Sequence, residues 1–244
     1  MSGHSKWNNI KRKKEKTDGQ RAKIFTKIGR EMTVCVRTSG GDPNVNNKLR
    51  DLIAKAKSLN VPNDNIQRII KKAEGGEKDN YESITYEGYG PSGIAMMVET
   101  LTDNRNRTAG NLRHYFDKFG GNMGNSGCVA FLFSQKGVIM LDVADKDDEK
   151  VMEDAFEAGA EDFDMDDGIC EITTTPESFS QTREALEKMG YTFISADISY
   201  VPSTQTALTD PDDLKKMGLL LEHLQDDDDV QNVWHNLENE EDLD

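Results

Sequence analysis

One stretch of the sequence decides the fold, and it runs GVIMLDVADKDDEKVMEDAFEAGAEDFDMDDGICEITT at residues 137–174. Its apolar positions alternate between the two-residue period of strands and the three- to four-residue period of helices, and the pattern continues to residue 200. The six predicted elements are strands at 137–143, 162–166, 169–174 and 192–200 and helices at 147–159 and 176–189. Their order, βαββαβ, indicates a ferredoxin-like domain, which we place at residues 137–203.

The segments on either side of this domain predict a second α+β domain. The elements expected before it are strands at Tyr81–Tyr86, Ile94–Leu101 and Cys128–Phe133 and a helix on which Leu112, Tyr115, Phe116 and Phe119 share one face. A helix from Pro211 to about Leu224 and a strand at Val230–Trp234 come after it and are too small to fold alone. We expect them to return, so that residues 77–136 plus 204–238 form one domain with residues 137–203 inserted in it. The terminal residues 238–244 should fray.

Residues 1–76 predict a basic helical domain. A first amphipathic helix is expected from about Gln20 to Val36, a second one capped by Asp42 with Pro43 in its first turn, and a third one capped by Asn63. The predicted fold class is therefore α+β and multidomain, with an N-terminal three-helix bundle and two α+β domains, one of them ferredoxin-like and inserted in the other.

Charge is distributed very unevenly along the chain. The whole chain of 244 residues has a net charge of -15, yet residues 1–72 hold 18 Lys and Arg against 6 Asp and Glu, and the remainder holds 12 against 39. These counts give +12 for the first segment and -27 for the rest. Such asymmetry is typical of a protein whose basic end binds nucleic acid, although a merely solvated lysine-rich surface is the alternative.

The candidate phosphate-binding residues lie in three groups. An arm before the first helix is rich in lysine and has only Trp7 and Ile10 as large apolar residues, so we expect it to be mobile. The first helix has cations beside its apolar face, and the third ends in cations that also suit the helix dipole. The predicted contacts are Lys6, Trp7, Lys11, Arg12, Lys13, Lys14 and Lys16 in the arm, Arg21, Lys23, Lys27 and Arg30 on the first helix, and Arg68, Lys71 and Lys72 on the third.

Arg105, Arg107 and Arg113 form a further group around the predicted start of a helix. Cations there oppose the helix dipole, a cost that a bound phosphate or a neighbouring carboxylate would relieve. We include all three as candidate nucleic-acid contacts, with salt bridges to the protein's own acidic residues as an equally weighted alternative.

Motifs for catalysis or cofactor binding are weak. Gly88, Gly90 and Gly93 fit G-x-G-x-x-G, but a strand rather than a helix is predicted to follow, which favours a tight turn. The aspartates at 162, 164 and 166 lack the glycine and glutamate positions of a calcium loop, and the runs of acidic residues, such as Asp226–Asp229, are typical of solvated surface. We therefore predict no enzyme activity, no metal, no cofactor and no small-molecule substrate.

The sequence also bears on where the protein works. Its three cysteines, an odd number at wide spacing, suit reduced thiols packed as small hydrophobic groups. There is no apolar run of about 20 residues and no signal-peptide pattern, which predicts a cytoplasmic protein that is not in a membrane. The sequence predicts no oligomeric state.

Several long segments resemble the YebC/PmpR family. They are SGHSKWNNIKRKK, IFTKIGREMTV, GGDPNVNNKLR, NVPNDNIQRIIKKA, YEGYGPSGIAMMVE, LTDNRNRT and GCVAFLFSQKGVI. The resemblance extends nearly from end to end, with residues 141–229 matching mainly in pattern and acidity and TDGQRAK departing modestly from the usual order. It implies a three-domain protein that is either a DNA-binding transcriptional regulator or, like mitochondrial relatives, a translational activator.

Three functions follow as hypotheses. The first is a transcriptional regulator bound to duplex DNA, and the second is a translation factor bound to ribosomal RNA on the ribosome. The third is a protein adaptor acting through the acidic domains, which an exposed apolar patch would support. In the first two, cations grip the phosphate backbone and affinity comes from counterion release. No recognition helix with base-reading side chains is evident, whereas a lysine-rich arm with an aromatic residue suits irregular RNA.

Overall fold

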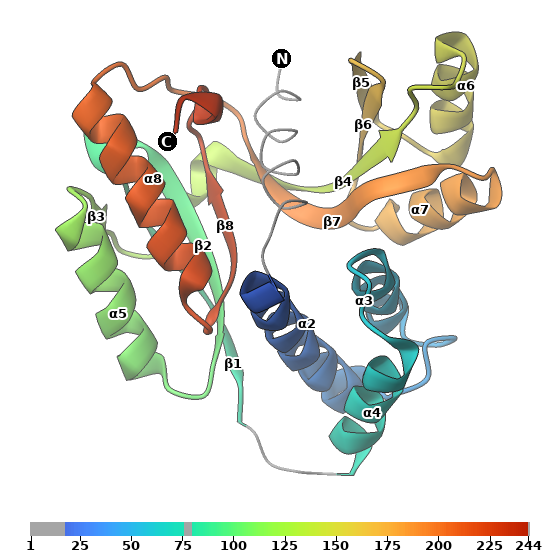
Figure 1. The fold of residues 1–244 in the computed structure, drawn as a ribbon, viewed down its shortest axis with the longest axis horizontal. Helices are drawn as coiled ribbons and strands as arrows, with labels where there is room; N and C mark the ends of the chain where they lie inside the picture. The colour runs from blue at the N-terminus through green and yellow to red at the C-terminus, as the bar shows by residue number, and fades with distance from the viewer. Residues whose placement is uncertain (1–17, 76–79, 244) are drawn as a thin grey trace. The chain divides into compact units, whose positions relative to one another are not determined.

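The computed structural model describes residues 18–75 and 80–243, with the side chains of residues 18–22 left out. Within these residues the chain forms seven helices and two four-stranded antiparallel sheets (Figure 1). Helices come first, and the α+β part follows, which confirms the predicted fold class. By internal contacts the chain divides into two compact units. One contains residues 42–67 and 135–201, and the other contains the described parts of 16–41, 68–134 and 202–244. The domain boundaries that the sequence suggests remain a prediction.

Three helices open the described chain, as predicted: α2 (Asp18–Ser39), α3 (Asn47–Ser58) and α4 (Asn63–Glu74). The predicted start of the second helix was wrong. Asn46 caps α3 by accepting a hydrogen bond of 3.1 Å from the Leu49 N–H, whereas the Asp42 side chain accepts from the Asn44 N–H inside a preceding turn. An Asp-Pro pair serves a turn as readily as a helix start, so the pattern alone chose the wrong residue.

The first sheet has the order β3-β1-β2-β8 and belongs to the second unit. Its strands are β1 (Glu82–Tyr89), β2 (Ala95–Thr102), β3 (Asn122–Met123) and β8 (Val230–His235). The turn between β1 and β2 contains a short 3-10 helix, η1 (Pro91–Gly93), in which Gly93 has a φ of 81°. The glycine motif is thus a tight turn between antiparallel strands, as predicted.

Two helices cover one face of this sheet and build its core. They are α5 (Arg105–Lys118) and α8 (Pro211–Asp226), and Figure 1 shows them side by side. Leu112 and Phe116 of α5 pack with Met217 and Leu220 of α8, all four fully buried. The strand β8 that follows α8 pairs antiparallel with β2, so the C-terminal segment does return to this sheet.

The chain end is more ordered than predicted. Residues 240–242 form a 3-10 helix, η3, and Leu243 is only 2% exposed because it joins the core of the first sheet. Asn239 adds two hydrogen bonds of 2.9 Å to the backbone of Leu208. The expectation of fraying was wrong because an acidic composition concealed one apolar anchor.

The second sheet has the order β5-β6-β4-β7 and lies in the first unit. Its elements are β4 (Phe133–Asp142), α6 (Asp148–Ala158), β5 (Asp162–Asp166), β6 (Ile169–Thr174), α7 (Phe179–Lys188) and β7 (Thr192–Pro202). The predicted βαββαβ order is confirmed, and Cys170, Ile139 and Leu186 lie in the core between sheet and helices.

One predicted strand does not exist. Residues 128–133 were expected to form a strand separate from 137–143, but β4 is one strand from Phe133, and the residues before it form a loop with a 3-10 helix, η2 (Ala130–Leu132). The cause is Glu87, whose carboxylate accepts hydrogen bonds of 2.7–2.9 Å from the N–H groups of Gly127, Val129 and Ala130. These amides are therefore not available to a strand partner.

Candidate nucleic-acid interface

The predicted basic arm falls outside the part of the chain that the structure describes. This applies to Lys6, Trp7, Lys11, Arg12, Lys13, Lys14 and Lys16, and Arg21 lies in α2 with a side chain that is likewise not described. Their roles stay predictions from the sequence.

Lys23, Lys27 and Arg30, which we call the basic stripe, do lie together on α2. They face residues 226–229, which we call the acidic loop and which run from the last residue of α8 to the residue before β8. Lys23 Nζ lies 2.9 Å from Asp226 Oδ1, and Lys27 Nζ donates a 2.7 Å hydrogen bond to the Gln225 carbonyl. Arg30 donates at 2.8 Å to the Asp228 carbonyl and at 3.1 Å to Asp229 Oδ1. The three cations therefore do lie together, but oxygen atoms of the same chain already accept hydrogen bonds or ion pairs from them.

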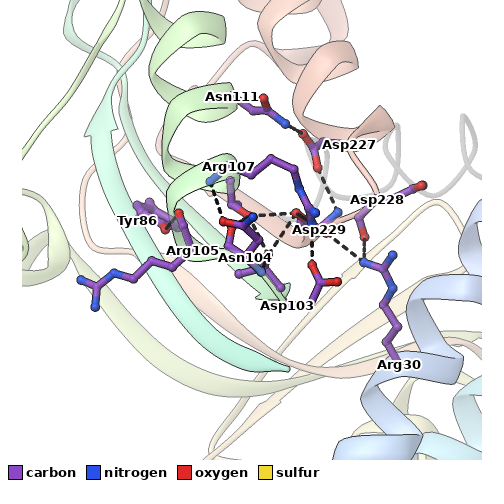
Figure 2. Close-up of polar contacts among 12 residues, drawn as sticks. Arg30, Tyr86, Asp103, Asn104, Arg105, Arg107, Asn111, Asp227, Asp228 and Asp229 are labelled. Carbon is purple, nitrogen blue, oxygen red and sulfur yellow. Dashed lines mark hydrogen bonds and ion pairs between the residues drawn. The ribbon is translucent and has the colours of Figure 1, made fainter. Parts of the chain in front are cut away.

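Asp229 is the centre of this contact (Figure 2). Its Oδ2 atom lies 2.7 Å from Arg107 Nη2 and 2.8 and 3.1 Å from the hydroxyls of Thr108 and Thr102. Burial alone would raise the pKa of Asp229, but the hydrogen bonds from Arg107 and the threonines lower it overall. The acidic run was predicted to be solvated, and for Asp229, which is 4% exposed, that was wrong.

The arginines of α5 divide into two kinds. Arg107 forms ion pairs with Asp103 at 2.8 Å and Asp229 at 2.7 Å, so the structure shows the salt-bridge alternative for this residue. Arg105 is exposed, and Figure 2 shows its side chain directed away from Asp229. Arg113 is exposed too, and neither it nor Arg105 forms an ion pair within residues 18–75 and 80–243.

The cations at the end of α4 keep the position that the sequence predicts. Arg68, Lys71 and Lys72 are all exposed. The two lysines lie in the last turn of α4, where their positive charges interact favourably with the negative end of the helix dipole. Whether they contact nucleic acid stays a prediction from the sequence.

Acidic residues of the ferredoxin-like part also form ion pairs with basic residues of α3, which the sequence did not predict. Within the first unit, Arg50 Nε lies 2.6 Å from Glu184 Oε1, and Lys55 Nζ lies 2.9 Å from Asp197 Oδ1. Opposite charges in one chain, +12 against -27, were the only signal that could have suggested such pairs.

Between the basic stripe and the acidic loop lies an open polar hollow of about 530 Å³, lined by Lys23, Arg30, Arg107 and the loop itself. Charged and amide groups dominate its walls, so it suits ions or a charged backbone rather than an apolar ligand. The helices of residues 18–75 and 80–243 include none that is long and apolar enough to cross a bilayer.

Comparison with known proteins gives consistent matches. Residues 5–76 match a family model described as the TACO1/YebC protein N-terminal domain, and residues 81–237 match one described as the TACO1/YebC second and third domain. A relative from Ruminiclostridium cellulolyticum is 59% identical over 243 residues, which cover 99% of this chain and 98% of the relative. A relative from Acetivibrio thermocellus is 57% identical over 238 residues, which cover 97% of this chain and 98% of that relative. Both are named "Probable transcriptional regulatory protein".

A solved structure has the same fold. The crystal structure of a conserved hypothetical protein from Aquifex aeolicus superposes with a TM-score of 0.83 at 42% sequence identity, covering 91% of this chain and 92% of that one.

Proposed function

Because the chain belongs to the TACO1/YebC family, we propose that it is a non-enzymatic, cytoplasmic regulator of transcription that acts by binding the phosphate backbone of DNA. The name of its relatives supports the regulatory role, since they are called transcriptional regulators and not enzymes. The observation that carries the binding mode is the segregation of charge, +12 in residues 1–72 against -27 in the remainder. A polyanion gains most from such a concentrated patch, because each neutralised phosphate releases counterions.

The proposed contacts fall into two classes. Lys71, Arg105 and Arg113 are exposed and can meet phosphates directly. The basic stripe of α2 is already paired with the acidic loop and can contribute only after exchange of partners. Backbone contacts position a protein on DNA without reading its sequence, so this set of residues supports affinity rather than sequence specificity.

Fluorescence anisotropy with a labelled 20-base-pair duplex, and with an RNA hairpin as comparator, tests the proposal. Arg105→Gln with Arg113→Gln should make the dependence of log Kd on log salt shallower by about two, one for each phosphate that is no longer neutralised. Lys188→Gln with Lys215→Gln removes the same charge from exposed sites elsewhere and should leave the slope unchanged. Equal effects of the two double variants would contradict these contacts.

Crosslinking in living cells, followed by sequencing of the bound nucleic acid, identifies the natural target. Enrichment of promoter DNA is the expected result. Enrichment of ribosomal RNA without promoter DNA would replace transcription by translation as the regulated step, and no enriched nucleic acid of either kind would refute the proposal.

A further inference from the structure

The acidic loop offers the basic stripe the same chemistry as a nucleic-acid backbone. In the acidic loop and at Gln225 just before it, a carboxylate and two carbonyl oxygens accept from three cations spaced along one side of α2. The contacts measure 2.7–3.1 Å, which is the range of N–H···O hydrogen bonds in proteins, and in each of them the donor is a cation. A phosphate backbone would have to take over these cations from the loop.

The two ends of the contact differ in exposure. Arg30 and Asp229 have side chains that are 20% and 6% exposed, and Asp229 also binds Arg107, so this end is part of the fold. Lys23 and Asp226 are 41% and 57% exposed, and Asp226 has Lys23 as its ion-pair partner. The contact should therefore open first at the Lys23 end, where solvent and competing anions have access.

Asp226 lies at a position where its own helix does not favour a carboxylate. Asp226 is the last residue of α8, and a carboxylate at a helix C-terminus opposes the helix dipole. By contrast, Asp212 lies in the first turn of α8, where the dipole favours it, and pairs with Lys216 at 2.6 Å. Asp226 thus carries an unfavourable local interaction that its contact with Lys23 offsets.

We propose that the acidic loop is an intramolecular competitor of nucleic acid for the basic stripe, so that binding exchanges loop oxygens for phosphates. This inference rests on the proposed function and adds regulation to it. An exposed ion pair is weak, so the loop lowers affinity several-fold without abolishing it. A polyphosphate chain wins the exchange because it releases many counterions together, whereas a short anion releases few. The device therefore favours long nucleic acid over small anions.

A double-mutant cycle tests this competition, with anisotropy of the labelled 20-base-pair duplex at 50 mM salt as the measurement and the RNA hairpin in a parallel arm. Asp226→Asn should tighten binding roughly two- to fivefold, the range expected for release of one exposed ion pair. In a Lys23→Gln background the same substitution should have no effect, because Asp226 acts through Lys23. Asp212→Asn removes the same charge from the same helix and is the matched control.

The outcomes separate the two claims. Tightening by Asp226→Asn that vanishes with Lys23→Gln supports the competition, and the arm in which it occurs shows which nucleic acid displaces the loop. Tightening that persists in the Lys23→Gln background, or that Asp212→Asn reproduces, is a general charge effect and overturns the competition while leaving nucleic-acid binding intact. If neither wild type nor Asp226→Asn binds either probe, the proposed function fails and the competition fails with it. Thermal melts of all variants check that each is folded.

Discussion

At the scale of single residues, Asp229 shows how one carboxylate connects distant segments. It accepts hydrogen bonds from α2, from α5 and from the end of β2, and its own carbonyl accepts from the Leu101 N–H at 2.7 Å. A buried carboxylate is stable only when such partners replace water. Asp229 has such hydrogen-bond donors on both of its carboxylate oxygens. Its neighbour Asp228, by contrast, accepts from Arg30 only through its backbone carbonyl.

Asp229→Ala should therefore destabilise the protein by about 2–4 kcal/mol, because Arg107 and the hydroxyls of Thr102 and Thr108 all lose a buried acceptor at once. Asp228→Ala, which keeps the backbone carbonyl and removes an exposed side chain, should cost less than about 0.5 kcal/mol. Urea unfolding followed by circular dichroism measures both. Similar costs for the two variants would show that the contacts of Asp229 contribute little.

The stabilisation by Asp229 should also depend on pH. The pKa of Asp229 is lower in the folded protein than its ordinary value of 3.8, so folding favours the ionised carboxylate. Its contribution is present above pH 4 and is lost as the pH falls through the folded pKa. The difference in unfolding free energy between wild type and Asp229→Asn should be constant from pH 5 to 7 and narrow below pH 4. A difference that widens on acidification would have the wrong sign.

At the scale of elements, Glu87 converts an expected strand into a loop. Burial alone would raise the pKa of Glu87, but the three backbone N–H groups of residues 127, 129 and 130 lower it, so the carboxylate stays ionised and holds the loop against β1. Glu87→Gln replaces one acceptor oxygen by an NH₂ group that faces a donor, which should cost about 1–3 kcal/mol. Faster amide exchange at Val129 and Ala130 should accompany the loss.

Glu82→Gln is the control for this change, since Glu82 lies on the same strand with an exposed side chain. Its stability and exchange should match wild type. Unchanged exchange at Val129 in Glu87→Gln would mean that other contacts hold the loop.

Elements of regular period were predictable from the sequence, and those fixed by long-range contacts were not. The βαββαβ order followed from the local spacing of the apolar residues along the sequence. The loop at residues 127–130 depends on a glutamate some 40 residues earlier, and the burial of Leu243 depends on a core built from other segments. For the site, helical spacing predicted the basic stripe, but no local pattern could show that residues almost 200 positions away would occupy it.

At the scale of the whole molecule, opposite charges in one chain have two consequences. Acidic residues after residue 72 form ion pairs with some of the basic residues before it, as Asp226 does with Lys23 and Glu184 does with Arg50. They also repel nucleic acid from the rest of the surface, so a polyanion should meet the protein only where cations are in excess. The residues with the least local competition in the sequence are those of the arm, where Lys11, Arg12, Lys13 and Lys14 are consecutive.

This leads to a prediction about salt. If about 6 to 10 phosphates are contacted, affinity should fall roughly 10³- to 10⁵-fold between 50 and 200 mM salt. Replacing Lys11, Arg12, Lys13 and Lys14 by Ala should reduce the slope of log Kd against log salt by about four, one for each cation removed from a phosphate. The melting temperature should not change, since the arm has few apolar residues with which to pack. A wild-type affinity that is flat across this salt range would rule out backbone binding. An unchanged slope in the variant, with wild type still salt-dependent, would move the contact surface from the arm to the cations of α4 and α5.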